Sequence, residues 1–374
     1  MYSPKYTITN QILKNIATTE ACREVIENAP LVPTYERKFK QDAIIRTVHH
    51  GTHIEGNDLT FTQAERVLSK FQGETDAGEN IKRSGVVARE RDVQEVINYR
   101  QVMEWLDGQF GRHEKKGEDS IFSYTETQIK QVHKLTVHKI VSMENEGNYR
   151  KTQVVLRDSR TGEITFRPPP AVEVPYLMED LLRWLNSATG RDIHPVLRAG
   201  IAHYALAAIH PFVEGNGRTA RAFATLILFV ERFDIKKLFS LEEYFDREAE
   251  AYYKALMLTS DQSRELNDRD LTCWLEYFTH GLSLELGRAK EKIRKLSVDA
   301  RIKKKHGEQI SLSDRQIRII EYLSENGKAA MSSLRELFPD YSEDTVLRDL
   351  QSLVKKGILI RTGHTKGVMY ELAT

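Results

Sequence analysis

The chain has 374 residues, of which 40% are hydrophobic, so it can bury a sizeable core and is expected to form two or three domains. Its 55 lysines and arginines nearly balance its 54 aspartates and glutamates, which excludes bulk attraction to nucleic acid or an anionic membrane and leaves only local binding. A secretory signal is not evident and no apolar run reaches the roughly 18–20 residues that span a bilayer, so we expect a cytoplasmic protein without membrane contact.

Apolar residues three and four positions apart predict helices over most of the first half of the chain. Residues 9–30 and 37–110 have this spacing, with breaks expected at 73–79 and 107–119. A further helix is predicted over 121–145, ending at Gly147-Asn148. Cys22 and Cys273 lie in helical surroundings without disulfide or metal spacing, and we interpret both as small buried side chains in a reducing compartment.

The periodicity changes near residue 150. Segments 153–157 and 163–166 are rich in β-forming residues, and 158–162 between them has the composition of a hairpin loop. Three prolines at 168–170 close this hairpin, after which 174–186 returns to helical spacing. Helices are then predicted to about residue 297.

The composition changes again at 288–308, where nine basic and three acidic side chains predict a charged connecting helix or linker. Beyond it, helices at 314–325, 332–337 and 343–356 and strands at 358–361 and 368–372 predict a winged helix-turn-helix with 343–356 as its recognition helix. Residues 311–374 hold nine basic and nine acidic side chains, so DNA binding and a protein-interaction or dimerisation role stay open alternatives. The side chains expected to face outward are Thr345, Arg348, Gln351 and Ser352 on the helix and Arg361, His364 and Lys366 on the wing.

The densest chemical signal lies at residues 210–221, between two apolar helices. Gly215-Asn216-Gly217 permits positive φ and inward-pointing N–H groups at a helix start, which predicts a nest for phosphate oxygens. Arg218 and Arg221 share one helix face and are expected to grip phosphates. Glu214 is the acid placed to hold Mg²⁺, and His210 has the ordinary pKa of a general base near neutrality.

This segment resembles the Fic family, whose motif reads His-x-Phe-x-(Asp/Glu)-Gly-Asn-Gly-Arg-x-x-Arg. Every fixed position is met, and the resemblance extends over about residues 35–285. It implies a protein adenylyltransferase, in which His210 deprotonates a Ser, Thr or Tyr hydroxyl that attacks the α-phosphorus of ATP. Glu214 would hold Mg²⁺, residues 215–217 the anion hole, and Arg218 and Arg221 the outer phosphates. Phe212 is expected to anchor the loop in the core.

Other features fit the same resemblance. The hairpin at 150–166 is similar to the family's flap, which pairs with an extended stretch of the target protein. Tyr252 and Tyr253 resemble its adenine-proximal aromatic residues, and at most one of two adjacent tyrosines is expected to stack on the base. The family also implies a homodimer and self-modification, while the nucleotide preference stays open.

Thr52-His53-Ile54-Glu55-Gly56-Asn57 resembles the family's inhibitory helix, in which Glu55 would pair with Arg221 and occupy the charge meant for the γ-phosphate. The family's hydroxyl residue belongs four positions before the glutamate, where this chain has Gly51, and Thr52 follows one position late. The spacing of His49, His50 and His53 could put two of them on one helix face as metal ligands. No third ligand is evident for such a pair, so we interpret these histidines as part of a polar helix face.

We therefore predict a mainly α protein, a Fic-type helical bundle with a β-hairpin flap plus a small α/β winged-helix domain. Its segments would be 1–110 with the inhibitory helix, 111–287 as the catalytic core, 288–308 as the basic connection and 309–374 as the winged helix. Two alternatives to AMP transfer remain: removal of AMP by water that Glu55 activates, and a DNA-binding regulator that responds to nucleotide.

Overall fold

The computed structural model describes residues 2–29, 33–70, 77–115, 121–157, 161–233, 238–305, 312–339, 341–363 and 368–373. The chain divides into two compact units, the first extending to Lys290 and the second beginning at Glu291. The predicted segments 1–110 and 111–287 pack together within the first unit. None of the helices in the described part of the chain is both long and apolar enough to cross a membrane.

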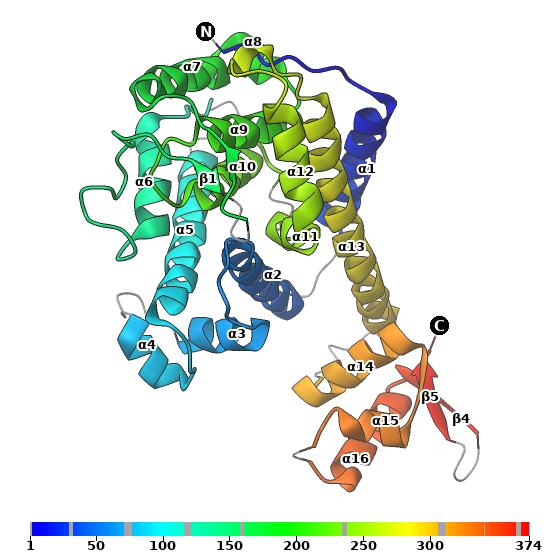
Figure 1. Cartoon of the computed structure of the whole chain (residues 1–374). Coiled ribbons are helices and arrows are strands. Elements are labelled where there is room, and N and C mark those ends of the chain that lie inside the picture. Colours follow the sequence, from blue (N-terminus) through cyan, green and yellow to red (C-terminus); the bar gives the residue numbers. More distant parts are fainter. Residues whose placement is uncertain are drawn as a thin grey trace. The chain divides into compact units, whose positions relative to one another are not determined.

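The first unit is a helical bundle, as predicted (Figure 1). Its helices in chain order are α1 (Asn10–Glu27), α2 (Pro33–His53), α3 (Phe61–Lys70), α4 (Ala77–Ser84), α5 (Glu90–Glu114), α6 (Glu126–Val137), α7 (Val174–Asn186), α8 (Ala188–Asp192), α9 (Pro195–Ile209), α10 (Asn216–Val230), α11 (Leu241–Arg247), α12 (Ala249–Ser260) and the first part of α13 (Thr272–Lys305). Short 3₁₀ turns, η1 (Ala171–Glu173) and η3 (Leu266–Asp268), precede α7 and α13.

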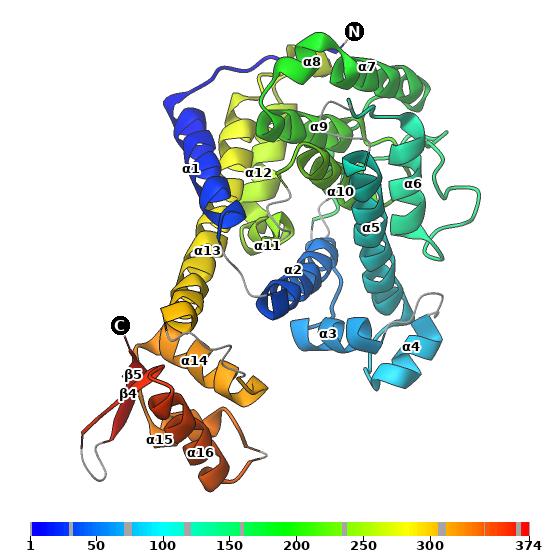
Figure 2. The same ribbon diagram turned by 180° about the vertical axis from the view of Figure 1, so that it is seen from behind.

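Helices α9 and α10 form the centre of this unit, between α5 and α6 on one side and α12 on the other (Figures 1 and 2). Nearly every residue of both helices is buried, which suits sequences that are apolar all around the helix. The loop that joins them carries residues 210–215, so the motif is held by the most deeply packed pair of helices in the bundle.

Several predicted boundaries were wrong. The break expected at 107 is absent because α5 continues through Gly108 and Gly111 to Glu114. The helix expected over 121–145 ends at Val137, where the buried Asn98 side chain of α5 donates to the carbonyls of Thr136 (3.2 Å) and His138 (2.7 Å). These carbonyls are thus capped by a side chain from another helix, and the following residues form turns instead.

The predicted hairpin is present but short. Strands β1 (Leu156–Arg157) and β2 (Ile164–Phe166) pair antiparallel, with Leu156 opposite Phe166 and Arg157 opposite Ile164. Residues 158–160 of the predicted turn lie outside the described part of the chain. Prolines 168–170 lie beyond β2 at the open end of the hairpin, and they have no N–H groups to extend the ladder. There the side chain of Gln153 donates to the carbonyl of Pro168 at 3.0 Å.

The second unit contains α14 (Asp314–Asn326), β3 (Lys328–Ala330), α15 (Met331–Glu336), α16 (Glu343–Lys355), β4 (Leu359–Thr362) and β5 (Met369–Leu372). The sheet has three antiparallel strands in the order β3-β5-β4, not the predicted two. Strand β3 was missed because Lys-Ala-Ala has no β-forming pattern, and its pairing with β5 makes it a strand. The predicted wing residues His364 and Lys366 lie outside the described residues.

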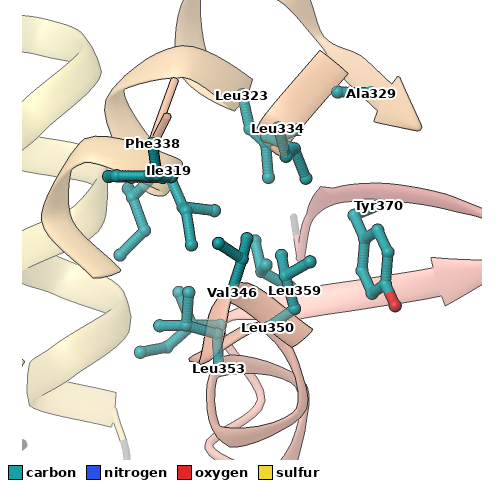
Figure 3. Packing of buried hydrophobic residues seen from close by; sticks show 12 residues of the cluster. Ile319, Leu323, Ala329, Leu334, Phe338, Val346, Leu350, Leu353, Leu359 and Tyr370 are labelled. Atoms are coloured by element: carbon teal, nitrogen blue, oxygen red, sulfur yellow. The ribbon is translucent and has the colours of Figure 1, made fainter. Parts of the chain in front are cut away.

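The core of the second unit forms between α14 and α16 and against the sheet (Figure 3). Val346, Leu350 and Leu353 of α16 are buried there, as their spacing predicts. The basic segment predicted at 288–308 is helical as far as Lys305, where α13 ends. Of the two cysteines, Cys22 is buried as expected, but Cys273 is exposed, because it lies on the outer face of α13.

Candidate active site

Two left-handed residues shape the loop between α9 and α10. His210 ends α9 with φ 52° and ψ 58°, a conformation that few residues other than glycine adopt, and Gly215 precedes α10 with φ 76°. Gly215 is required twice, because a Cβ there would lie 2.6 Å from Cγ1 of Val137. The side chain of Asn216 closes the loop by accepting from the N–H of Phe212 and donating to its carbonyl, both at 2.9 Å. Phe212 is fully buried, as an anchor must be.

The first turn of α10 holds a carboxylate. Arg221 Nη1 donates to Oε1 of Glu55 at 2.8 Å, while Nη2 donates to the carbonyl of Gly51 at 2.8 Å. A Cβ at Gly217 would lie 2.2 Å from that same Oε1. The predicted Glu55–Arg221 pair is therefore formed, and the carboxylate rests over the helix start that the sequence assigns to phosphate.

Electrostatics favour the charged form of this pair. Arg221 is 1% exposed and Glu55 is 28% exposed at the side chain. Burial alone would raise the pKa of Glu55, but the charges of Arg221 and Arg218 outweigh it and hold that pKa below its ordinary value. Glu55 is thus an anion at neutral pH.

The irregular hydroxyl position has a steric cause. A Cβ at Gly51 would lie 2.4 Å from Cε1 of Tyr99, which packs from α5 against this turn of α2. Any side chain at 51 would displace that ring. Thr52 uses its hydroxyl differently, donating to the carbonyls of Val48 and His49 at 3.0 Å near the end of α2. At the position where the family has a hydroxyl side chain, this chain has Gly51, and its backbone carbonyl accepts from Arg221.

His210 presents one nitrogen for chemistry. Its Nδ1 lies 3.2 Å from the carbonyl of Ala207, and a carbonyl only accepts, so Nδ1 carries the proton and Nε2 has the free lone pair. Burial lowers the pKa of His210 to about 4, and the charge of Arg150 acts in the same direction, against the Ala207 bond and Glu55. The ring is therefore neutral and able to accept a proton at pH 7.

Glu214 and Arg218 belong to a charge network that continues onto α5. The half-exposed carboxylate of Glu214 pairs with Arg91 and lies 3.8 Å from Arg218. Arg218 is buried and lies 3.3 Å from Glu95, which also accepts from Asn57 at 2.9 Å. Sequence reasoning missed Arg91 and Glu95, because an arginine and an acid four apart on a helix are usually an ordinary surface pair.

His133 of α6 is a second residue that the sequence did not single out. Its ring stacks on Phe212 with centroids 3.6 Å apart and planes 2° from parallel. Nδ1 accepts from the N–H of Gly147 (3.0 Å), so Nε2 donates to the carbonyl of Glu214 (2.9 Å). Burial lowers the pKa of His133 to about 4 and keeps it neutral. A histidine on an apolar helix face gives no sequence signal for such a role.

The two tyrosines point in different directions. Tyr252 is buried against Phe245 (centroids 4.9 Å apart), with its hydroxyl 3.0 Å from Nε2 of His203. Tyr253 is 41% exposed, and its hydroxyl donates to the carbonyl of Ile54 at 3.1 Å, next to Glu55 in the chain. Of the pair, only Tyr253 therefore has a ring face open to a base.

The histidines near the end of α2 bind a carboxylate. Nδ1 of His50 lies 2.7 Å and Nδ1 of His53 2.8 Å from the oxygens of Asp246 on α11. His49 packs its ring against that of Phe61 instead, with centroids 5.5 Å apart. These contacts join α2 to α11.

Comparison with known proteins agrees with this geometry. Residues 123–228 match the model of the Fic/DOC family, and residues 315–364 match that of a DeoR-like helix-turn-helix domain. "Protein adenylyltransferase Fic" of Drosophila melanogaster is 30% identical over 192 residues, 51% of this chain and 34% of that protein. The protein of the same name from Drosophila grimshawi is 29% identical over 192 residues, again 51% of this chain and 34% of that protein. The chain thus spans about a third of the length of these curated relatives.

Among solved structures, a Fic family protein from Desulfovibrio desulfuricans G20 is similar over 99% of this chain and 98% of its own, with a TM-score of 0.60 and 24% identity. A Fic domain containing signaling protein from Bacteroides thetaiotaomicron aligns over 78% of this chain and 97% of its own, with a TM-score of 0.57 and 21% identity. At these identities the likeness establishes a shared fold. The first unit of this chain accordingly carries a Fic/DOC family domain, and its second unit is a DeoR-like helix-turn-helix domain.

Proposed function

We propose that this chain is a protein adenylyltransferase, which moves AMP from ATP to a Ser, Thr or Tyr hydroxyl of a protein and is restrained by its own Glu55. One observation carries the proposal: a neutral histidine with a free Nε2 lies in the loop that leads to a helix start already holding an anion. Both halves of a hydroxyl-to-phosphate transfer, the proton acceptor and the anion cradle, are then within one loop.

The residues present fit ATP and Mg²⁺. The Glu55 carboxylate beside Gly217 stands in for a phosphate, because both offer anionic oxygens to Arg221 at the start of a helix. Glu214 would hold the metal through its half-exposed carboxylate, a hard oxygen ligand of the kind Mg²⁺ prefers. When bound, Mg²⁺ would neutralise part of the phosphate charge. Tyr253 would face the adenine.

The chain's own residues supply the remaining chemistry. Nε2 of His210 takes the proton of the target hydroxyl, whose oxygen forms a bond to the α-phosphorus. The bond from that phosphorus to the bridging oxygen breaks, and pyrophosphate leaves with the bonding electrons. Arg218 and Arg221 would bind its oxygens. The hairpin at 150–166 would present an edge to the target backbone, which aligns a hydroxyl without requiring a particular sequence.

The same geometry explains the restraint. While Glu55 pairs with Arg221, the charge of that arginine is already neutralised, and the outer phosphates of ATP lose their partner. A competing role for Glu55, activation of water to remove AMP, uses the same position but is a different reaction: water attacks the phosphorus, the bond to the protein oxygen breaks, and AMP is released.

The test uses self-modification, since the target is unidentified. Wild type, Glu55→Gly, His210→Ala and the double variant are incubated with Mg²⁺ and each nucleoside triphosphate labelled at its α-phosphate. Transfer from ATP by Glu55→Gly that disappears in the double variant supports the proposal. If no variant incorporates label from any nucleotide, the proposal is overturned. If Glu55→Gly that has modified itself loses its AMP when wild-type protein is added, that result would favour the removal of AMP.

DNA binding by the second unit is a second candidate, favoured by the DeoR-like match at residues 315–364. Arg348, Gln351 and Lys355 are exposed on α16, whereas Glu343 at its start pairs with Arg335 (3.2 Å) and opposes phosphate. Titration of mixed duplex DNA with the full chain at rising salt decides it. Binding that weakens with salt and with Arg348→Ala supports DNA, and none at low salt favours an interaction or dimerisation module.

A further inference from the structure

Arg150 is the first residue of the hairpin segment 150–166 and lies beside the loop that carries His210. The residue is 3% exposed, and its Nε donates to the carbonyl of His210 at 2.8 Å. Its backbone N–H donates to the carbonyl of the next residue, Pro211, at 2.9 Å. One arginine therefore binds two consecutive carbonyls of the loop.

The other nitrogens of the same guanidinium reach the hairpin. Nη1 donates to the carbonyl of Thr152 (3.3 Å), which precedes β1, and Nη2 donates to that of Pro169, which follows β2. Both ends of the hairpin are thus tied to one planar group, and that group is tied to His210. Phe166 of β2 adds an edge contact, with its ring centroid 6.5 Å from that of His210.

Two features make this attachment consequential. His210 is held in the left-handed region, which is strained for a residue with a side chain and persists only if its surroundings fix it. The hairpin has only a short ladder, Leu156–Arg157 against Ile164–Phe166, so its own pairing does little to fix its base. A buried arginine with a rigid fork of donors can fix both at once, whereas lysine offers a single nitrogen.

We propose that Arg150 is a positioning residue, which fixes His210 relative to the hairpin and so aligns a hydroxyl docked there with Nε2. The inference rests on the proposed transfer reaction. Arg150 touches no reacting atom and acts through backbone carbonyls, so it contributes to the rate by geometry. Its charge also adds to the lowered pKa of His210, which gives a second property to measure.

The test compares Arg150→Lys and Arg150→Gln in the Glu55→Gly background. Arg269→Lys is the matched control, because Arg269 is also buried and its Nε and Nη2 donate to the carbonyls of Ser263 (2.8 Å) and Arg264 (3.2 Å), outside the site. We expect Arg150→Lys to lower kcat about 100-fold, as misplacement of a reacting group by about an ångström does, with little change in KM for ATP. The control should match the parent in kcat, whatever each variant loses in melting temperature.

NMR titration of the His210 ring gives a readout that does not need activity. Arg150→Gln removes the charge and should make His210 titrate at a higher pH than in the parent, whereas Arg150→Lys keeps the charge and should not. If Glu55→Gly transfers nothing, the proposed function fails, while this titration still tests the contact. A kcat of Arg150→Lys equal to that of Arg269→Lys, or a His210 titration unmoved in Arg150→Gln, overturns the inference.

Discussion

Replacing Glu55 by glycine should weaken the fold and activate the enzyme at the same time. The change removes the partner of Arg221, which is 1% exposed and would keep only its bond to the Gly51 carbonyl from this turn. Breaking a fully buried pair costs about 3–5 kcal/mol, and because the Glu55 side chain is 28% exposed we expect about 2–3 kcal/mol here. For a unit of this size that lowers the melting temperature by roughly 4–10 °C.

The same free energy acts in the opposite sense on the reaction. In the proposed reaction, Glu55 would keep Arg221 from binding the outer phosphates by about 2–3 kcal/mol, which corresponds to about a 30- to 150-fold change in an equilibrium. We therefore expect transfer of α-labelled AMP to the protein itself to rise by about this factor in Glu55→Gly. Scanning calorimetry without nucleotide gives the loss of stability, and label incorporation gives the gain in rate.

Asp58→Gly is the control, since Asp58 is an exposed acid three residues further on whose partner is Arg89. It should change the melting temperature by less than the loss of Glu55 does and leave transfer at the wild-type rate. The reasoning would be refuted by a Glu55→Gly variant that melts with the wild type, or by one whose transfer does not exceed that of Asp58→Gly.

Three further predictions concern the neighbouring residues. Because burial lowers the pKa of His210 to about 4, transfer by Glu55→Gly should persist below pH 6.5 and be lost only toward pH 4; a decline centred on 6.5 would contradict this. Gly51→Ser should destabilise the fold by about 1–3 kcal/mol in urea unfolding, because its side chain overlaps Tyr99, and the same substitution should cost less when made in Tyr99→Ala. His133→Ala should cost about 1–3 kcal/mol by leaving the Glu214 carbonyl and the Gly147 N–H without their partner. The pKa of His133 is about 4 in the fold, so its stabilisation is complete above pH 6.5 and fades as the pH falls toward 4, and the variant should show a shallower dependence there.

Local chemistry explains what could be predicted about the site. Residues 210–221 are contiguous, and two glycines around an asparagine before an apolar helix permit the positive φ and the inward-pointing N–H groups of a phosphate nest. The hairpin and α7 followed from periodicity, with α7 found at the predicted residues 174–186. The pairing of Glu55 with Arg221 joins residues far apart in the chain and was predicted through the resemblance, not from spacing.

What failed depended on contacts between distant segments. The end of α6 is set by Asn98 of α5, and strand β3 exists because β5 pairs with it. His133 and Arg150 gave no signal because a histidine on a helix face and an arginine before a strand have many ordinary uses.

By itself, then, the sequence determined the chemistry of the loop, because its residue types and short-range geometry are local. The tertiary structure decided how that chemistry is held and restrained. Burial sets the pKa of His210, Tyr99 forces glycine at 51, and Arg150 joins the loop to the hairpin. Each of these depends on which side chains from distant segments pack against the loop, and the spacing of residues along the sequence does not specify those contacts.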